Sequence, residues 1–109
     1  MSRASLSEIV KNEAALVSEY GLHHYDVAIA VPRDAKGYGL DEWFDSAIVG
    51  WDASMQTYFI QCIELEDGLA WWLGTEYAEI PTFAVLCEVI ERIFDNQVAF
   101  QFVDTIERQ

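Results

Sequence analysis

Two strand-like runs on either side of an Asp-Gly pair constrain the fold of this chain most. Residues 57–64, TYFIQCIE, are rich in β-branched and aromatic side chains, and residues 69–73, LAWWL, form a second such run. The pair Asp67-Gly68 between them suits the tight turn of a β-hairpin. The sequence therefore predicts two antiparallel strands joined by a turn at 66–68.

Two further strands are expected before this hairpin. Residues 25–31 alternate large and small side chains, so that their large members would share one face of a strand that Pro32 ends. Ala47–Trp51 has the composition of a short strand and leads into a turn. Residues 33–45, which hold two glycines, are expected to form a loop between these strands.

Helices are expected on both sides of the strands. An apolar stripe at helical spacing predicts a helix over Leu6–Tyr20, and Ser5 and Glu8 have the spacing of a capping box. A second helix is predicted over Phe83–Phe94, with Thr82 as its N-cap.

The last segment, Gln97–Arg108, fits two structures. Val98, Phe100 and Phe102 alternate as in a strand, whereas Ala99, Phe102, Val103 and Ile106 fit a helix, which we expect. The order of elements predicts a single α+β domain over residues 1–109. It would hold an antiparallel sheet of about four strands, an N-terminal helix and one or two C-terminal helices.

The distribution of charge says most about function. Nineteen acidic residues face six basic ones, for a net charge of −13, and no Lys or Arg lies between Lys36 and Arg92. Direct binding to nucleic acid or to an anionic membrane surface needs clustered basic residues and is therefore not expected. A basic protein partner is favoured, because complementary charge speeds encounter and selects partners.

Compartment and chemistry are constrained by what the sequence lacks. No apolar run approaches the length of a membrane span, and the N-terminus has no secretory signal, so we expect a cytoplasmic protein. Cys62 and Cys87 lie in apolar stretches, where buried thiols are more common than a disulfide. The adjacent His23 and His24 would point to opposite faces of a strand and so would not share a metal ion.

Catalysis is not expected either. Glu88 and Glu91 are neighbours on the predicted helix, yet nothing indicates the shielded pocket that a general acid needs. Motifs for a nucleophile, a phosphate-binding loop or an EF-hand are missing. We therefore expect a protein that is not an enzyme and that uses neither cofactor nor metal.

What remains is an acidic surface with aromatic residues among its charges. Carboxylates spaced along a helix or strand can approximate the track of nucleic-acid phosphates and so occupy a basic groove. The candidate partner-binding carboxylates are Asp41, Glu42, Asp45, Asp52, Glu64, Glu66 and Asp67. Trp43, Phe44 and Trp51 are candidate anchors, provided that they are exposed.

Four runs within residues 49–95 resemble a pattern found in a set of short, uncharacterised bacterial proteins: G-aromatic-D, T-aromatic-F-x-Q, W-x-G-T and acidic-hydrophobic-P-T. Here the runs are Val49–Asp52, Thr57–Cys62, Trp72–Thr75 and Glu79–Thr82. This resemblance implies no activity. In general character the chain is also similar to the anti-CRISPR and other anti-defence proteins of phages and plasmids, which are often short and acidic.

The leading expectation is a non-enzymatic inhibitor that occupies the basic surface of a nucleic-acid-handling protein, such as a CRISPR effector. An immunity protein or antitoxin that neutralises a cognate nuclease toxin would use the same surface. A third alternative is an acidic domain whose charge has no specific partner.

Overall fold

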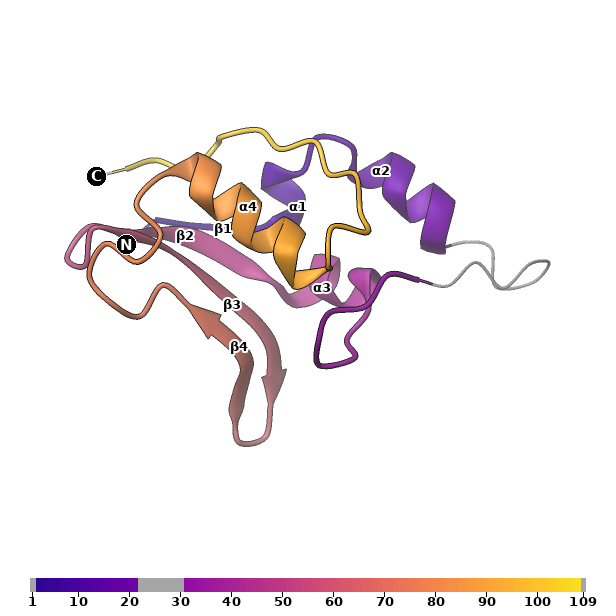
Figure 1. Ribbon diagram of the computed structural model, residues 1–109, viewed down its shortest axis with the longest axis horizontal. Coiled ribbons are helices and arrows are strands. Elements are labelled where there is room, and N and C mark those ends of the chain that lie inside the picture. Colours follow the sequence, from indigo (N-terminus) through magenta and orange to yellow (C-terminus); the bar gives the residue numbers. More distant parts are fainter. Residues whose placement is uncertain (1, 22–30, 109) are drawn as a thin grey trace.

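The fold is a four-stranded antiparallel sheet with helices packed on one face (Figure 1). A computed structural model describes residues 2–21 and 31–108. In chain order the elements are β1 (Ser2–Ser5), α1 (Leu6–Ile9), α2 (Glu13–Leu16), the π-helical turn η1 (Val17–Gly21), α3 (Leu40–Ser46), β2 (Ile48–Asp52), β3 (Thr57–Leu65), β4 (Gly68–Leu73) and α4 (Phe83–Ile93). The predicted α+β class is confirmed.

The sheet is a meander in the order β1-β2-β3-β4. The predicted hairpin is confirmed: β3 and β4 pair from Ile60↔Leu73 to Leu65↔Gly68, and a two-residue turn joins them. Gly68 has a φ of +128°, a conformation that side-chain-bearing residues rarely adopt, which explains a glycine at this turn. The predicted strand at 47–51 is present as β2.

The first strand of the sheet, β1, is one that the sequence did not predict. Ser2–Ser5 forms β1, which pairs with β2 from Ser2↔Trp51 to Ser5↔Ile48. Four residues are too few to show a period, so this strand follows from pairing with β2 and not from a local pattern. The strand expected at 25–31 lies almost entirely outside the described residues.

The helix expected over Leu6–Tyr20 is broken into short pieces. The prediction of a helix over Gln97–Arg108 is wrong. The chain becomes extended at Val10, which forms an antiparallel bridge with Phe102. The backbone N–H of Lys11 donates to the Gln101 carbonyl at 2.7 Å, and that of Val103 donates to the Ile9 carbonyl at 2.8 Å. The C-terminal segment is therefore not helical, because part of its backbone pairs with the break between α1 and α2.

Helix α4 matches its prediction and closes the core. Thr82 caps it by accepting a hydrogen bond from the Val85 N–H at 3.2 Å. Its residues Leu86 and Ile90 are fully buried, and Phe83 meets the ring of Tyr58 on β3 at 6.1 Å between centroids. The helix thus covers one face of the sheet, and none of the described helices covers the other face (Figure 1).

Candidate partner-binding surface

Asp41, Glu42 and Asp45 lie on helix α3 and not in the loop that the sequence predicted. All three are exposed. The Gly39 N–H donates to Glu42 Oε1 at 3.2 Å, and acidic side chains in a first turn also suit the positive end of the helix dipole. The loop predicted over 33–45 is present over 33–39 and wrong from residue 40 on, where these local interactions and a buried tryptophan stabilise a helix.

That tryptophan is Trp43, which the structure buries completely. Its indole N–H donates to Asp34 Oδ2 at 2.7 Å, and the indole of Trp71 on β4 donates to the same oxygen at 2.8 Å. The other oxygen of Asp34 accepts from the backbone N–H groups of Lys36 at 2.8 Å and Tyr38 at 3.0 Å. Asp34 thus connects α3, β4 and the loop that precedes α3 through hydrogen bonds, and these bonds help to fix the orientation of α3.

Burial removes the anchoring role expected for three aromatic residues. Trp43, Phe44 and Trp51 are exposed by 0%, 8% and 4%, respectively, so none can insert into a partner. Trp51 instead packs against Tyr58 at 4.9 Å and lies under the guanidinium of Arg108 at 4.1 Å. The exposed tryptophan is Trp72 on β4, with 58% of its surface accessible, which the sequence did not distinguish from its neighbour Trp71.

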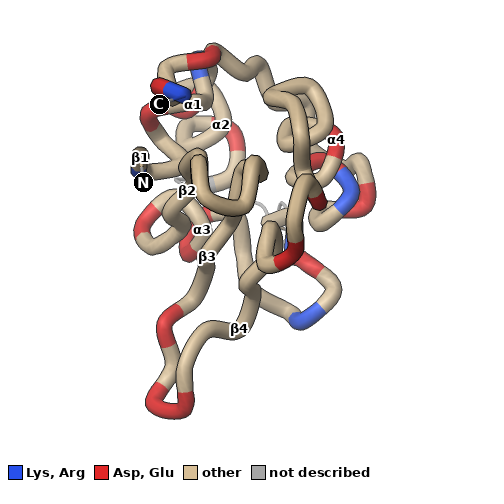
Figure 2. Tube along the Cα trace, turned by 90° about the vertical axis from the view of Figure 1, so that its left-hand side faces the viewer, with Lys and Arg blue, Asp and Glu red and all other residues tan. Residues whose placement is uncertain are grey.

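Glu64, Glu66 and Asp67 lie at the end of the β3–β4 hairpin and are exposed. Figure 2 shows these acidic residues at the tip of the hairpin, where it projects beyond the rest of the sheet. The sequence correctly placed Glu66 and Asp67 at the turn and Glu64 in the strand before it. We call them, together with Asp41, Glu42 and Asp45 of α3, the acidic surface.

The helix that carries one part of the acidic surface packs on the strand that leads to the other part. Helix α3 packs on β3, and Ser46 Oγ at the end of the helix lies 3.7 Å from Cys62 Sγ on the strand. Burial raises the pKa of the Cys62 thiol to about 11, and the charges of Asp34 and Glu42 contribute in the same direction. The acids of the helix are thus near the strand that leads into the hairpin.

Asp52 is set apart from this surface, because it closes the turn after β2. Its Oδ1 accepts from the Ser54 hydroxyl at 2.7 Å, the Ser54 N–H at 3.1 Å and the Met55 N–H at 3.4 Å. The hydrogen bond from the Ser54 hydroxyl is the main cause that lowers the pKa of Asp52. Asp52 therefore has a structural task at one carboxylate oxygen.

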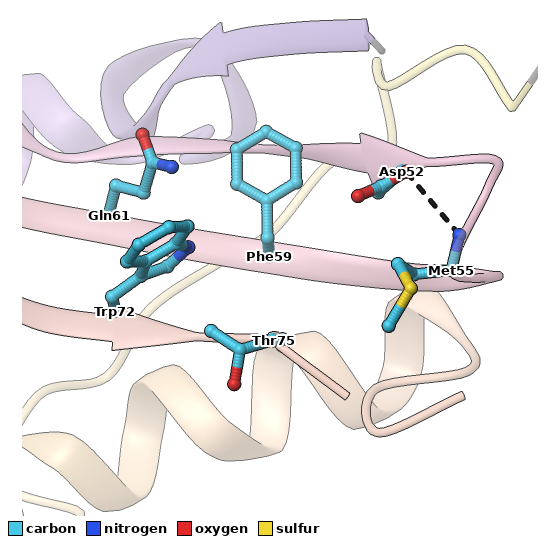
Figure 3. A pocket seen from close by; sticks show the side chains of 7 residues that line it. Asp52, Met55, Phe59, Gln61, Trp72 and Thr75 are labelled. Carbon is cyan, nitrogen blue, oxygen red and sulfur yellow. Dashed lines mark hydrogen bonds between the residues drawn. The ribbon is translucent and has the colours of Figure 1, made fainter. Parts of the chain in front are cut away.

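A groove that the sequence did not predict lies on the uncovered face of the sheet (Figure 3). We call it the open-face groove, and its volume is about 280 Å³. It is lined by Asp52, Met55, Phe59, Gln61, Trp72, Gly74 and Thr75. All but Met55 belong to the runs that resemble the bacterial pattern, so this pattern was the available signal for the groove.

Two glycines pack closely against Phe59, one against its ring and one against its backbone. A Cβ on Gly50 would lie 2.5 Å from that ring and 2.0 Å from the Ser2 carbonyl oxygen. A Cβ on Gly74 would lie 2.1 Å from the Tyr58 carbonyl oxygen and 2.7 Å from the Phe59 Cα. Both positions lack room for a side chain, so only glycine allows Phe59 and the neighbouring backbone to pack this closely beside the groove.

The described cysteines are poor nucleophiles. Burial raises the pKa of Cys62 to about 11 and that of Cys87 to about 12, so both are almost entirely protonated at neutral pH. Within residues 2–21 and 31–108, no group of three or more His, Cys, Asp or Glu side chains could hold a metal ion. His23 and His24 lie outside the described residues.

In the part of the chain that the structure describes, no helix has both the length and the apolar character needed to cross a bilayer. No family model, curated protein or solved structure matches the chain.

Proposed function

We propose that this chain is a non-enzymatic binding protein that inhibits a nucleic-acid-handling protein by occupying its basic surface. The observation that carries the proposal is the acidic surface. Its six exposed carboxylates lie on two adjacent elements, within a stretch from 37 to 91 that contains no Lys or Arg.

The spacing of these acids supports a nucleic-acid-like surface. Asp41 and Asp45 are four residues apart on α3, which places such side chains about 5–6 Å from each other. Two steps along one strand of duplex DNA advance about 7 Å along the axis. Carboxylates at this spacing can therefore face the arginine and lysine side chains that a basic groove aligns for phosphates.

Affinity capture from host lysate with the intact chain tests the proposal. The partner should bind more weakly as salt rises, because salt screens exposed charges. The triple variant Asp41→Asn, Glu42→Gln, Asp45→Asn should bind roughly tenfold more weakly, since three exposed ion pairs each contribute up to about 1 kcal/mol. Retention on the immobilised protein and a titration of the purified partner give these values.

The matched control is Glu76→Gln, Glu88→Gln, Asp95→Asn, which removes the same net charge from exposed positions outside the acidic surface. Equal binding by both triple variants, or binding that does not change with salt, would reject the proposal. The nature of the partner separates the two biological settings. A CRISPR effector indicates an anti-defence inhibitor, and a nuclease toxin indicates an immunity protein.

A further inference from the structure

The open-face groove has the size of one long side chain. Its volume of about 280 Å³ lies just below the roughly 300–1,000 Å³ typical of small-molecule and cofactor pockets. It equals about nine water molecules at ~30 Å³ each. The groove is therefore large enough for a single protruding side chain.

The two ends of the groove differ in chemistry. Asp52 lies at one end and Trp72 with Gln61 at the other, and Phe59 lies between them (Figure 3). The register pairs Asp52 with Thr57 and Trp72 with Gln61, so the two ends are two strands and four residues apart. From ordinary strand spacings, the Cα atoms of Asp52 and Trp72 are roughly 17 Å apart. The distance between the ends of their side chains is shorter, because both side chains extend into the groove.

Both ends have unused hydrogen-bonding capacity. All three described hydrogen bonds to Asp52 go to Oδ1, and no described residue donates to Oδ2. The side-chain amide of Gln61 has no hydrogen-bond partner among the described residues. A ligand would therefore find an acceptor for a cation at one end and an amide that can pair with a peptide group at the other.

We propose that the open-face groove receives an arginine side chain of the basic partner, with the guanidinium at Asp52 Oδ2 and the peptide backbone beside Gln61 and Trp72. This inference rests on the proposed function. It gives the same partner a second contact, in addition to the one at the acidic surface. The aliphatic part of the side chain lies across Phe59 and Met55.

Charge and hydration favour arginine as the occupant. The guanidinium is more weakly hydrated than an ammonium group, so it enters a partly apolar groove more readily, and it pairs well with a carboxylate. Among the lysines and arginines, the nearest in register is Arg3, which pairs with Gly50 on β1 and does not line the groove. Lys36 is engaged elsewhere, because its ammonium donates to the Ala70 carbonyl and lies over the ring of Trp71.

A titration of the full-length chain with a blocked Gly-Arg-Gly tripeptide, followed by two-dimensional NMR, tests this inference. We expect shifts of the Trp72 indole and Gln61 side-chain signals and of the Ser54 and Met55 amides. Asp52→Asn keeps an oxygen for the turn but removes the charge, and should weaken binding about two- to fivefold. Trp72→Ala should weaken it similarly, and Trp72→Phe should restore part of the loss.

Glu88→Gln is the matched control, because it removes one exposed charge on α4, away from the groove lining, and should leave the affinity unchanged. Equal binding of a blocked Gly-citrulline-Gly or Gly-Lys-Gly peptide would overturn the assignment to arginine. Agmatine that binds as tightly as the arginine tripeptide would overturn the contact with a partner's backbone. The peptide titration tests the groove alone, and the capture experiment with the α3 variant tests the acidic surface. Failure of one proposal can therefore be distinguished from failure of the other.

Discussion

At the scale of single residues, Asp34 is the group on which the site depends most. It is 6% exposed, and its two oxygens accept four hydrogen bonds, two from tryptophan indoles and two from backbone amides. A buried carboxylate is tolerated only when such donors replace its hydration. Removing it would leave four donors without their acceptor, one of them in a buried and three in partly buried hydrogen bonds.

We therefore expect Asp34→Ala to lower the free energy of unfolding by about 3 kcal/mol. Urea denaturation, followed by tryptophan fluorescence, measures this change directly, because Trp43 and Trp71 both contact the carboxylate. Asp45→Ala removes an exposed carboxylate from the same helix and should change stability by no more than about 0.5 kcal/mol. Similar costs for the two variants would contradict the role given to Asp34.

Asp34 also explains why the sequence did not reveal the fate of the aromatic residues. Its partners Trp43 and Trp71 are 9 and 37 positions away, so no local pattern indicates that they converge. Trp71 and Trp72 have the same composition around them, and only the pairing of β4 with β3 decides which one faces the core. The exposure of the carboxylates was easier to predict than their secondary structure, because an exposed charge needs no partner.

At the scale of elements, the sequence predicted those that are specified by local signals. The β3–β4 hairpin follows from an Asp-Gly turn between β-rich runs, and α4 follows from Thr82 and an apolar stripe. The break at Val10 and the extended C-terminal segment depend on each other over about ninety residues, as the bond from Gln101 to Asn12 shows. Such pairing has no local signature, so the helical reading of 97–108 was wrong.

Asn12 is the side chain that holds these two segments together. Its Nδ2 donates to the Ala99 carbonyl at 2.9 Å, and its Oδ1 accepts from the Gln101 N–H at 3.0 Å. Asn12→Ala should cost about 1–2 kcal/mol, because two hydrogen bonds are lost. We expect faster hydrogen exchange at the Gln101 and Val103 amides, with the amides of β3 unchanged.

Gln97→Ala serves as the comparison, since it removes an exposed amide from the same segment without touching Asn12. Its exchange profile should match that of the natural chain. If Asn12→Ala also left the exchange at Gln101 and Val103 unchanged, the segment would be held by its buried side chains, Val98 and Ile106, and not by the asparagine.

At the scale of the whole molecule, the net charge of −13 destabilises the folded state through repulsion between like charges. The exposed carboxylates of α3 and the hairpin repel one another, and folding brings them closer together than they are in an extended chain. Added salt should therefore raise the free energy of unfolding at pH 7, because it screens this repulsion between exposed charges. Urea midpoints at low and at physiological ionic strength measure the effect.

The size of this effect should depend on pH. The net negative charge of the protein falls in acid, so the repulsion and its response to salt should both shrink. The triple variant Asp41→Asn, Glu42→Gln, Asp45→Asn should respond less to salt at pH 7 than the natural chain and should be at least as stable at low salt. A variant that was less stable and equally sensitive to salt would show that these acids stabilise the fold. A role in stability would then explain why α3 carries these acids, and no binding partner would be needed to explain them.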